Sequence, residues 1–163
     1  MKIRSGRRED IPALLAIYNY EVVHGVATLD LQERTIAEWT TWFESHREPH
    51  YPLLVVEVNG HVAGYATLSS YRDKEAFQST VELSIYIDPD YRGQGIATQL
   101  MDAMLAFARH DDTIHLVVSV ITVGNEASVY LHKRFQFQYC GTMCQVGYKH
   151  GAYRDIVNYT LQV

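Results

Sequence analysis

The sequence predicts a mixed α/β fold in which a mostly antiparallel sheet is flanked by helices. Two apolar, β-branched runs, at residues 53–58 and 62–68, are joined by Asn59-Gly60, a dipeptide typical of a tight β-hairpin. Apolar residues recur at helical spacing over residues 10–23 and again over 96–109. Strand patterns on both sides of the second of these helices predict a parallel strand pair around it.

The first half of the chain begins with a short predicted strand at residues 2–5. The helix predicted at residues 10–23 has Pro12 near its start, where proline is tolerated. A second helix begins at Thr35, because Thr35 and Glu38 have the spacing of a capping box. We expect the aromatic face of this helix to pack in the core; it consists of Trp39, Trp42 and Phe43.

Residues 81–87 alternate strictly, so that Val81, Leu83, Ile85 and Ile87 face one side of the sheet and the residues between them face the other. A helix at 96–109, a buried strand at 115–121 and a short helix at 127–134 follow. Two closing strands are predicted at 137–144 and 153–161. The predicted order is therefore strand, two helices, three strands, helix, strand, helix and two strands.

Composition limits the class of protein. The 163 residues indicate one domain spanning residues 1–163. The formal net charge of −5 argues against a nucleic-acid partner. Without an apolar run of about 20 residues or an apolar leader, we expect no membrane association and a cytoplasmic location. Cys140 and Cys144 are expected to be reduced thiols.

A glycine-bearing loop connects the strand ending at Ile87 to the helix that begins at Ile96. The first turn of a helix has unpaired N–H groups and a partial positive charge, and glycines let this backbone approach a phosphate closely. The loop lacks the Gly-Lys-Ser/Thr of a P-loop and the third glycine of a dinucleotide fingerprint. From the residues alone, both a pyrophosphate site and an ordinary turn remain open.

Arg92-x-x-Gly95-x-Ala97 resembles the R/Q-x-x-G-x-G/A signature of the GNAT superfamily of N-acetyltransferases, and the element order is similar along the whole chain. The resemblance implies a GNAT-like fold and acetyl-coenzyme A (acetyl-CoA) as co-substrate, with no metal. Asn125 begins a second similar segment, in which Gln136 stands where the family usually has glycine before Phe137. The implied cofactor-binding residues are Ile85, Tyr86, Ile87, Arg92, Gly93, Gln94, Gly95, Ile96, Ala97, Thr98, Asn125 and Ser128.

Several segments resemble the phosphinothricin acetyltransferase branch, which includes methionine sulfone and methionine sulfoximine acetyltransferases. They include residues 80–86, close to T-x-E-x-S-V-Y, and the run Val146-Gly147-Tyr148-Lys149-His150-Gly151. The resemblance implies transfer of an acetyl group to the α-amino group of a small amino acid analogue by a homodimer. Two alternatives are another amine acceptor (a polyamine, an antibiotic or a protein N-terminus) and a non-catalytic acetyl-CoA sensor.

The segment before Glu82 departs from the branch, which typically shows R-x-A-Y. This chain has Lys74 and Phe77 in place of the arginine and tyrosine, with Arg72 nearby. Lysine acts as a point charge, whereas arginine grips an anion through two parallel hydrogen bonds. The implied substrate-binding residues are Arg72, Lys74, Phe77 and Glu82.

Acetyl transfer to an amine requires that the amine first lose a proton. The resemblance implies that Glu82, on the polar face of the strand at 81–87, is the base or binds the substrate ammonium; from the residues alone, a solvated strand carboxylate or a salt-bridge partner is the alternative. Counted from Asn125, His132 stands where many family members have a tyrosine acid, which implies a proton donor; a structural histidine is the alternative. By family analogy, the backbone N–H of Ile87 is the candidate oxyanion donor.

Overall fold

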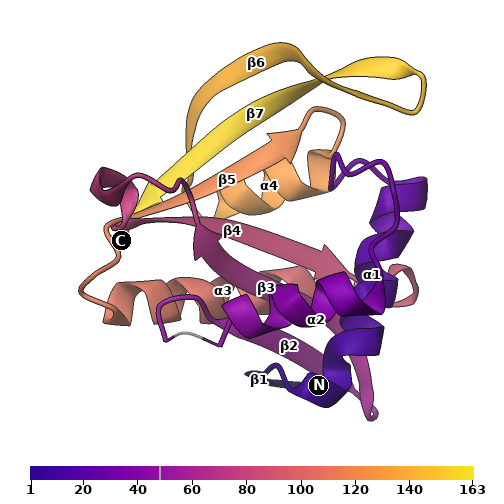
Figure 1. The fold of residues 1–163 in the computed structure, drawn as a ribbon. Coiled ribbons are helices and arrows are strands. Elements are labelled where there is room, and N and C mark those ends of the chain that lie inside the picture. Colours follow the sequence, from indigo (N-terminus) through magenta and orange to yellow (C-terminus); the bar gives the residue numbers. More distant parts are fainter. Residues whose placement is uncertain (48) are drawn as a thin grey trace.

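The structure, a computed structural model, describes residues 1–47 and 49–163 and has one seven-stranded sheet with helices on both faces (Figure 1). The strands lie in the order β1-β2-β3-β4-β5-β7-β6. The predicted fold class and element order are confirmed. The strands are β1 (Lys2–Ser5), β2 (Leu53–Val58), β3 (His61–Ser70), β4 (Thr80–Ile87), β5 (Leu116–Thr122), β6 (Gln138–Lys149) and β7 (Ala152–Gln162). The helices are α1 (Ile11–His24), α2 (Ile36–Ser45), α3 (Ile96–His110) and α4 (Glu126–Arg134).

The alternation predicted for β4 divides the core into two clusters, one on each face of the sheet. Val81 and Leu83 are buried in the cluster that also contains the apolar side of α3. Tyr86 packs instead against the cluster built from α1, α2 and the other face of β2 and β3. Successive side chains of a strand point to opposite faces, so each face of β4 serves a different layer of helices.

Helix α2 begins where the capping box predicts. The Thr35 hydroxyl accepts from the Glu38 N–H at 3.3 Å, and the Glu38 carboxylate accepts from the Thr35 N–H at 2.7 Å. Trp39 and Phe43 are buried as expected. Trp42 is only half-buried, and both tryptophans also line a cavity, so the interpretation of the three aromatics as core alone is incomplete.

The parallel pairing of β4 with β5 is short and determines where the site lies. It runs from Thr80 to Glu82, after which β4 continues to pair only with β3 as far as Ile87. The two strands diverge beyond this point (Figure 1). Residues 85–87 therefore pair with β3 along one edge, and along the other edge no strand of the described chain pairs with them.

The closing hairpin β6–β7 is longer than the predicted strands at 137–144 and 153–161. Its register shifts twice, between Tyr139 and Gly141 and between Met143 and Gly147. Such bulges interrupt the alternation of side chains, so the sequence pattern stops before the strand does. In the described part of the chain, none of the helices combines the length and apolar character needed to cross a bilayer.

Candidate active site

A cavity of about 560 Å³ lies between the diverging end of β4 and the N-termini of α3 and α4; we call it the α3–α4 cavity. Every residue predicted to bind the cofactor lines it except Gln94, which is exposed and directs its amide toward the carbonyl of Asp90. The predicted residues found in its lining are Ile85, Tyr86, Ile87, Arg92, Gly93, Gly95, Ile96, Ala97, Thr98, Asn125 and Ser128. The structure thus gathers two separate sequence motifs around one cavity.

The loop before α3 is built for close approach by a ligand. Gly93 and Gly95 have φ angles of +75° and +78°, in the left-handed region that side chains rarely adopt. Apart from each glycine and its two chain neighbours, no described heavy atom lies within 4 Å of where a Cβ would stand. Gly95 directly precedes α3, whose first N–H groups have no partner within the helix. Unpaired donors and the positive end of a 15-residue helix favour an anion such as a diphosphate here.

Arg92, the first residue of the loop motif, is held by helix α1. Its guanidinium forms an ion pair with the carboxylate of Glu21 and lies 5.4 Å from the centre of the Tyr20 ring. Glu21 is 9% exposed and lines the α3–α4 cavity. Gly25 makes room for it, because a Cβ at this position would overlap the Glu21 carboxylate. Sequence reasoning missed Glu21, since no local pattern connects positions 71 residues apart.

Glu82 is the last residue of β4 that pairs with β5, opposite Val118. Its side chain is half-buried, and burial raises its pKa above the usual value for a glutamic acid. It lines neither the α3–α4 cavity nor the second cavity described below. It shares a face of β4 with Ser84 and Tyr86, which do line the second cavity, so a base at Glu82 would stand beside both spaces.

His132 lines the α3–α4 cavity but lies on the opposite face of the sheet from Glu82. Its Nε2 is 2.8 Å from the hydroxyl of Ser119, the residue after Val118, which pairs with Glu82. Adjacent strand residues point to opposite faces, so Ser119 and Glu82 project in opposite directions. The structure does not bring the two predicted catalytic side chains to the same face.

Both ring nitrogens of His132 have protein partners. Nδ1 lies 2.7 Å from the carbonyl of Ser128, and a carbonyl only accepts, so Nδ1 carries the proton and Nε2 accepts from Ser119. His132 is 4% exposed, and burial lowers its pKa. This arrangement favours the structural alternative, and the proton-donor role stays a prediction.

The protonation of His132 gives a pH prediction. Because its pKa is below the ordinary 6.5 in the folded state, the unfolded chain binds the proton first, and unfolding becomes easier as the pH falls through about 6.5. We expect the free energy of unfolding to be lower at pH 5 than at pH 7. The NMR chemical shifts of the His132 imidazole, measured as a function of pH, test whether this histidine is the cause. A pKa of His132 at or above 6.5 would contradict the prediction.

The remaining predicted substrate residues lie in the connection between β3 and β4. Arg72 and Lys74 are exposed, and the guanidinium of Arg72 stands 5.0 Å from the ring centre of Tyr71 and 5.6 Å from that of Phe77. None of the three predicted residues lines either cavity. Their contact with an acceptor stays a prediction.

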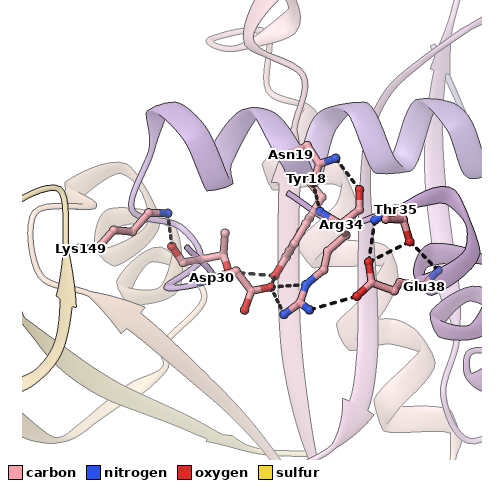
Figure 2. Close-up of polar contacts among 8 residues, drawn as sticks. Tyr18, Asn19, Asp30, Arg34, Thr35, Glu38 and Lys149 are labelled. Carbon is pink, nitrogen blue, oxygen red and sulfur yellow. Dashed lines mark hydrogen bonds and ion pairs between the residues drawn. The ribbon is translucent and has the colours of Figure 1, made fainter. Parts of the chain in front are cut away.

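A second cavity, of about 540 Å³, lies between helices α1 and α2 and the face of β3 and β4 that carries Glu82; we call it the α1–α2 cavity. Aromatic rings line it together with one polar cluster, Tyr18, Asp30, Arg34 and Glu38. Figure 2 shows the hydrogen bonds and ion pairs of this cluster. None of these four residues was predicted to line a ligand site; Glu38 was predicted only as part of the capping box of α2. Asp30 and Arg34 lie between the predicted helices, where nothing local marks them.

Comparison with known proteins decides the family. The sequence model of the acetyltransferase (GNAT) family matches residues 16–137, about three quarters of the chain. The chain belongs to the GNAT family of acetyltransferases. This confirms the resemblance inferred from Arg92, Gly95 and Ala97.

The sequence relatives of this GNAT chain match it over nearly its whole length. An L-methionine sulfoximine/L-methionine sulfone acetyltransferase of Pseudomonas paraeruginosa is 38% identical over 94% of this chain and 90% of its own. The L-amino acid N-acyltransferase MnaT of Escherichia coli is 36% identical over 100% of this chain and 94% of its own length. The crystal structure of a GNAT superfamily phosphinothricin acetyltransferase from Sinorhizobium meliloti in complex with acetyl-CoA has a TM-score of 0.94 at 29% identity, covering 99% of this chain and 88% of that one.

Proposed function

We propose that this enzyme transfers the acetyl group of acetyl-CoA to the α-amino group of a small amino acid analogue of the methionine sulfone, methionine sulfoximine or phosphinothricin type. The α3–α4 cavity carries this proposal. It joins a helix N-terminus suited to a diphosphate with residues 85–87 of β4, which pair with no described strand on the side where β5 diverges. The named activities of the relatives give the acceptor class.

Each step of the proposed reaction is assigned to a group of this chain. Acetyl-CoA supplies the activated acetyl group. Glu82, with a pKa raised by burial, takes a proton from the acceptor ammonium, which frees the nitrogen lone pair to attack the acetyl carbonyl carbon. In this proposal the backbone N–H of Ile87 stabilises the negative charge that develops on the carbonyl oxygen. Transfer forms the amide bond and breaks the bond from the acetyl carbon to sulfur. The nitrogen loses its second proton as the amide forms, and one proton is taken up by the departing thiolate, so coenzyme A leaves as a thiol.

Release of the thiol of coenzyme A measures the reaction. We expect thiol release from acetyl-CoA that depends on added methionine sulfone, with the acetylated amine as product. Spermidine, an aminoglycoside and a peptide N-terminus serve as competing acceptors. Binding of acetyl-CoA without thiol release for any amine would mean that the chain is a sensor and would overturn the proposal.

We also propose that the protein is a homodimer in which the β6–β7 hairpin contributes to the contact. Large apolar side chains on this hairpin are exposed, with Tyr139 at 60%, Met143 at 52%, Tyr148 at 56% and Tyr153 at 66%. Of these, the rings of Tyr148 and Tyr153 pack together with centres 5.1 Å apart, and exposed apolar side chains that gather on one element are typical of an interaction site. We expect twice the chain mass in solution at micromolar concentration and a shift toward monomer in Y148E. A monomeric mass for the unaltered protein would contradict this proposal.

A further inference from the structure

We propose that Lys149 is a positioning residue for acetyl-CoA, and that it acts by holding residues 25–30 in place as part of the wall of the α3–α4 cavity. Lys149 itself lines neither cavity. It belongs to residues 147–150 of the β6–β7 hairpin, which we call the hairpin tip, and residues 25–30 are called the 25–30 segment. This inference rests on the proposed acetyl-CoA site and deepens it, because it assigns part of that site to a residue outside the cavity.

The 25–30 segment contributes to both cavities but has no regular structure of its own. It follows the end of α1, and none of its residues belongs to a helix or a strand. Val26 and Ala27 line the α3–α4 cavity, and Asp30 lines the α1–α2 cavity. A segment without the hydrogen bonds of a helix or sheet takes its position from contacts with neighbouring elements. The shape of the α3–α4 cavity therefore depends on what holds this segment.

Two hydrogen bonds from the hairpin tip anchor the segment. The ammonium of Lys149 donates to the carbonyl of Thr28 at 2.7 Å, and Figure 2 shows Lys149 pointing toward the chain that leads to Asp30. His150 Nε2 lies 3.0 Å from the carbonyl of Gly25, and a carbonyl only accepts, so the imidazole donates. The two segment residues that line the α3–α4 cavity therefore lie between two anchored positions, 25 and 28.

The hairpin tip is a firm support for these bonds. Lys149 is the last residue of β6, it pairs with Ala152 of β7, and its carbonyl accepts from Arg154 Nε at 3.1 Å. Leu29 packs against Gly147, where an added Cβ would stand 2.9 Å from Leu29 Cδ1. An apolar contact thus accompanies the hydrogen bonds, and both come from a pair of hydrogen-bonded strands.

The buried ammonium of Lys149 makes this support sensitive to a single substitution. Lys149 is 2% exposed, and its Nζ also donates at 3.1 Å to the carbonyl of Glu21, in the last turn of α1. Carbonyls at the end of a helix carry a partial negative charge and favour a cation. A buried charge is costly unless it is hydrogen-bonded, so the ammonium stabilises the arrangement in which both carbonyls stay within its reach. An apolar side chain of the same length would remove this preference.

Glu21 extends the connection to the loop before α3. Its carbonyl accepts from Lys149, and its carboxylate forms the ion pair with Arg92. Glu21 and Arg92 both line the α3–α4 cavity. Lys149 is thus linked to this cavity by two routes, one through the 25–30 segment and one through Glu21. We therefore expect its loss to weaken the binding of acetyl-CoA and to leave the chemical step largely unchanged.

The first test replaces Lys149 by methionine, which keeps an unbranched side chain but has no charge and no donor. We expect the Kd for acetyl-CoA, measured by calorimetry, to rise roughly tenfold or more in K149M, the scale of one hydrogen bond to a charged group. The KM for acetyl-CoA should rise in parallel, while kcat at saturating acetyl-CoA stays within about threefold. In the ligand-free protein, the backbone amides of the 25–30 segment should exchange hydrogen faster than in the unaltered chain.

The matched control is R4M, which removes another cation whose side chain is mostly buried. Arg4 pairs with Asp10 and Glu57, and none of these three residues lines either cavity. Both substitutions are expected to lower the free energy of unfolding, because each removes the hydrogen bonds of a buried charge. Only K149M should change the Kd for acetyl-CoA. A similar rise in R4M would mean that a general loss of stability is the cause, and would overturn the role of Lys149.

A second, milder variant is H150N, at an exposed position of the hairpin tip. His150 has a φ angle of +52°, which asparagine tolerates, but the shorter side chain does not reach the carbonyl of Gly25. We expect the Kd for acetyl-CoA to rise about two- to tenfold, the scale of one neutral hydrogen bond. The control is H115N, which removes an exposed imidazole that lies 2.9 Å from Gln162 and outside both cavities. It should leave the Kd unchanged.

The outcomes separate this inference from the proposed function. An unchanged Kd for acetyl-CoA in K149M and H150N, or in H150N alone if K149M does not fold, overturns the role of the hairpin tip while acetyl transfer stands. A large fall in kcat with an unchanged Kd overturns it as well. If acetyl-CoA binds but no amine gives thiol release, the proposed function fails, and the series of Kd values still decides the role of Lys149. If the unaltered protein does not bind acetyl-CoA, both fail.

Discussion

Substitution of Gly95 by aspartate is expected to abolish stabilisation of the fold by acetyl-CoA. A ligand that binds only the native state at 100 times its Kd raises the free energy of unfolding by about 2.7 kcal/mol. In G95D a carboxylate would stand at the N-terminus of α3, in the wall of the α3–α4 cavity, where the phosphates are expected to bind. Thermal unfolding with and without acetyl-CoA measures the loss.

The control for this variant is G60D, in the turn between β2 and β3. Gly60 has a φ angle of +82°, close to the +78° of Gly95, and no heavy atom lies within 4 Å of a Cβ at either position. Both variants therefore carry a similar backbone strain, and both are expected to lower the melting temperature of the free protein. Only G95D should lose the response to acetyl-CoA; an unchanged response in G95D would remove the assignment of the loop.

The fold was predictable because its determinants are local. The capping box at Thr35, the Asn59-Gly60 turn and the alternation in β4 each operate within a few residues and each is found where expected. Gln136, which replaces the family's usual glycine, adopts a φ angle of +66°, the left-handed conformation that glycine favours. The turn before Phe137 is thus kept despite the departure in sequence.

The site was predictable only as far as it is made of contiguous motifs. The loop and strand of the α3–α4 cavity follow one another in sequence, so their residues were identified together. The ion pair between Glu21 and Arg92 and the paired carboxylates of Arg34 depend on how α1 and α2 pack on the sheet. His132 was predicted by counting along the chain, which gives no information on the face of the sheet that a helix covers.

Substitution of Glu82 by glutamine tests the chemistry most directly. Glutamine keeps the shape of the side chain but cannot accept the proton, and loss of a general base typically lowers the rate by about 10²–10⁴-fold. A base role lowers kcat, whereas a role limited to binding the ammonium raises KM with kcat largely kept. Stabilisation by acetyl-CoA should remain, because Glu82 does not line the α3–α4 cavity.

The pH profile adds a second readout for Glu82. A base works only when deprotonated, and burial raises the pKa of this carboxyl above its ordinary 4.5. The acid limb of kcat for the unaltered enzyme should therefore lie at higher pH than an exposed glutamate would give, and it should be absent from the residual activity of E82Q. E44Q, which removes a half-exposed carboxylate of α2 that pairs with Arg47, should keep both the rate and the acid limb. If E82Q turns over methionine sulfone as fast as the unaltered enzyme at neutral pH, the proton leaves the amine by another route.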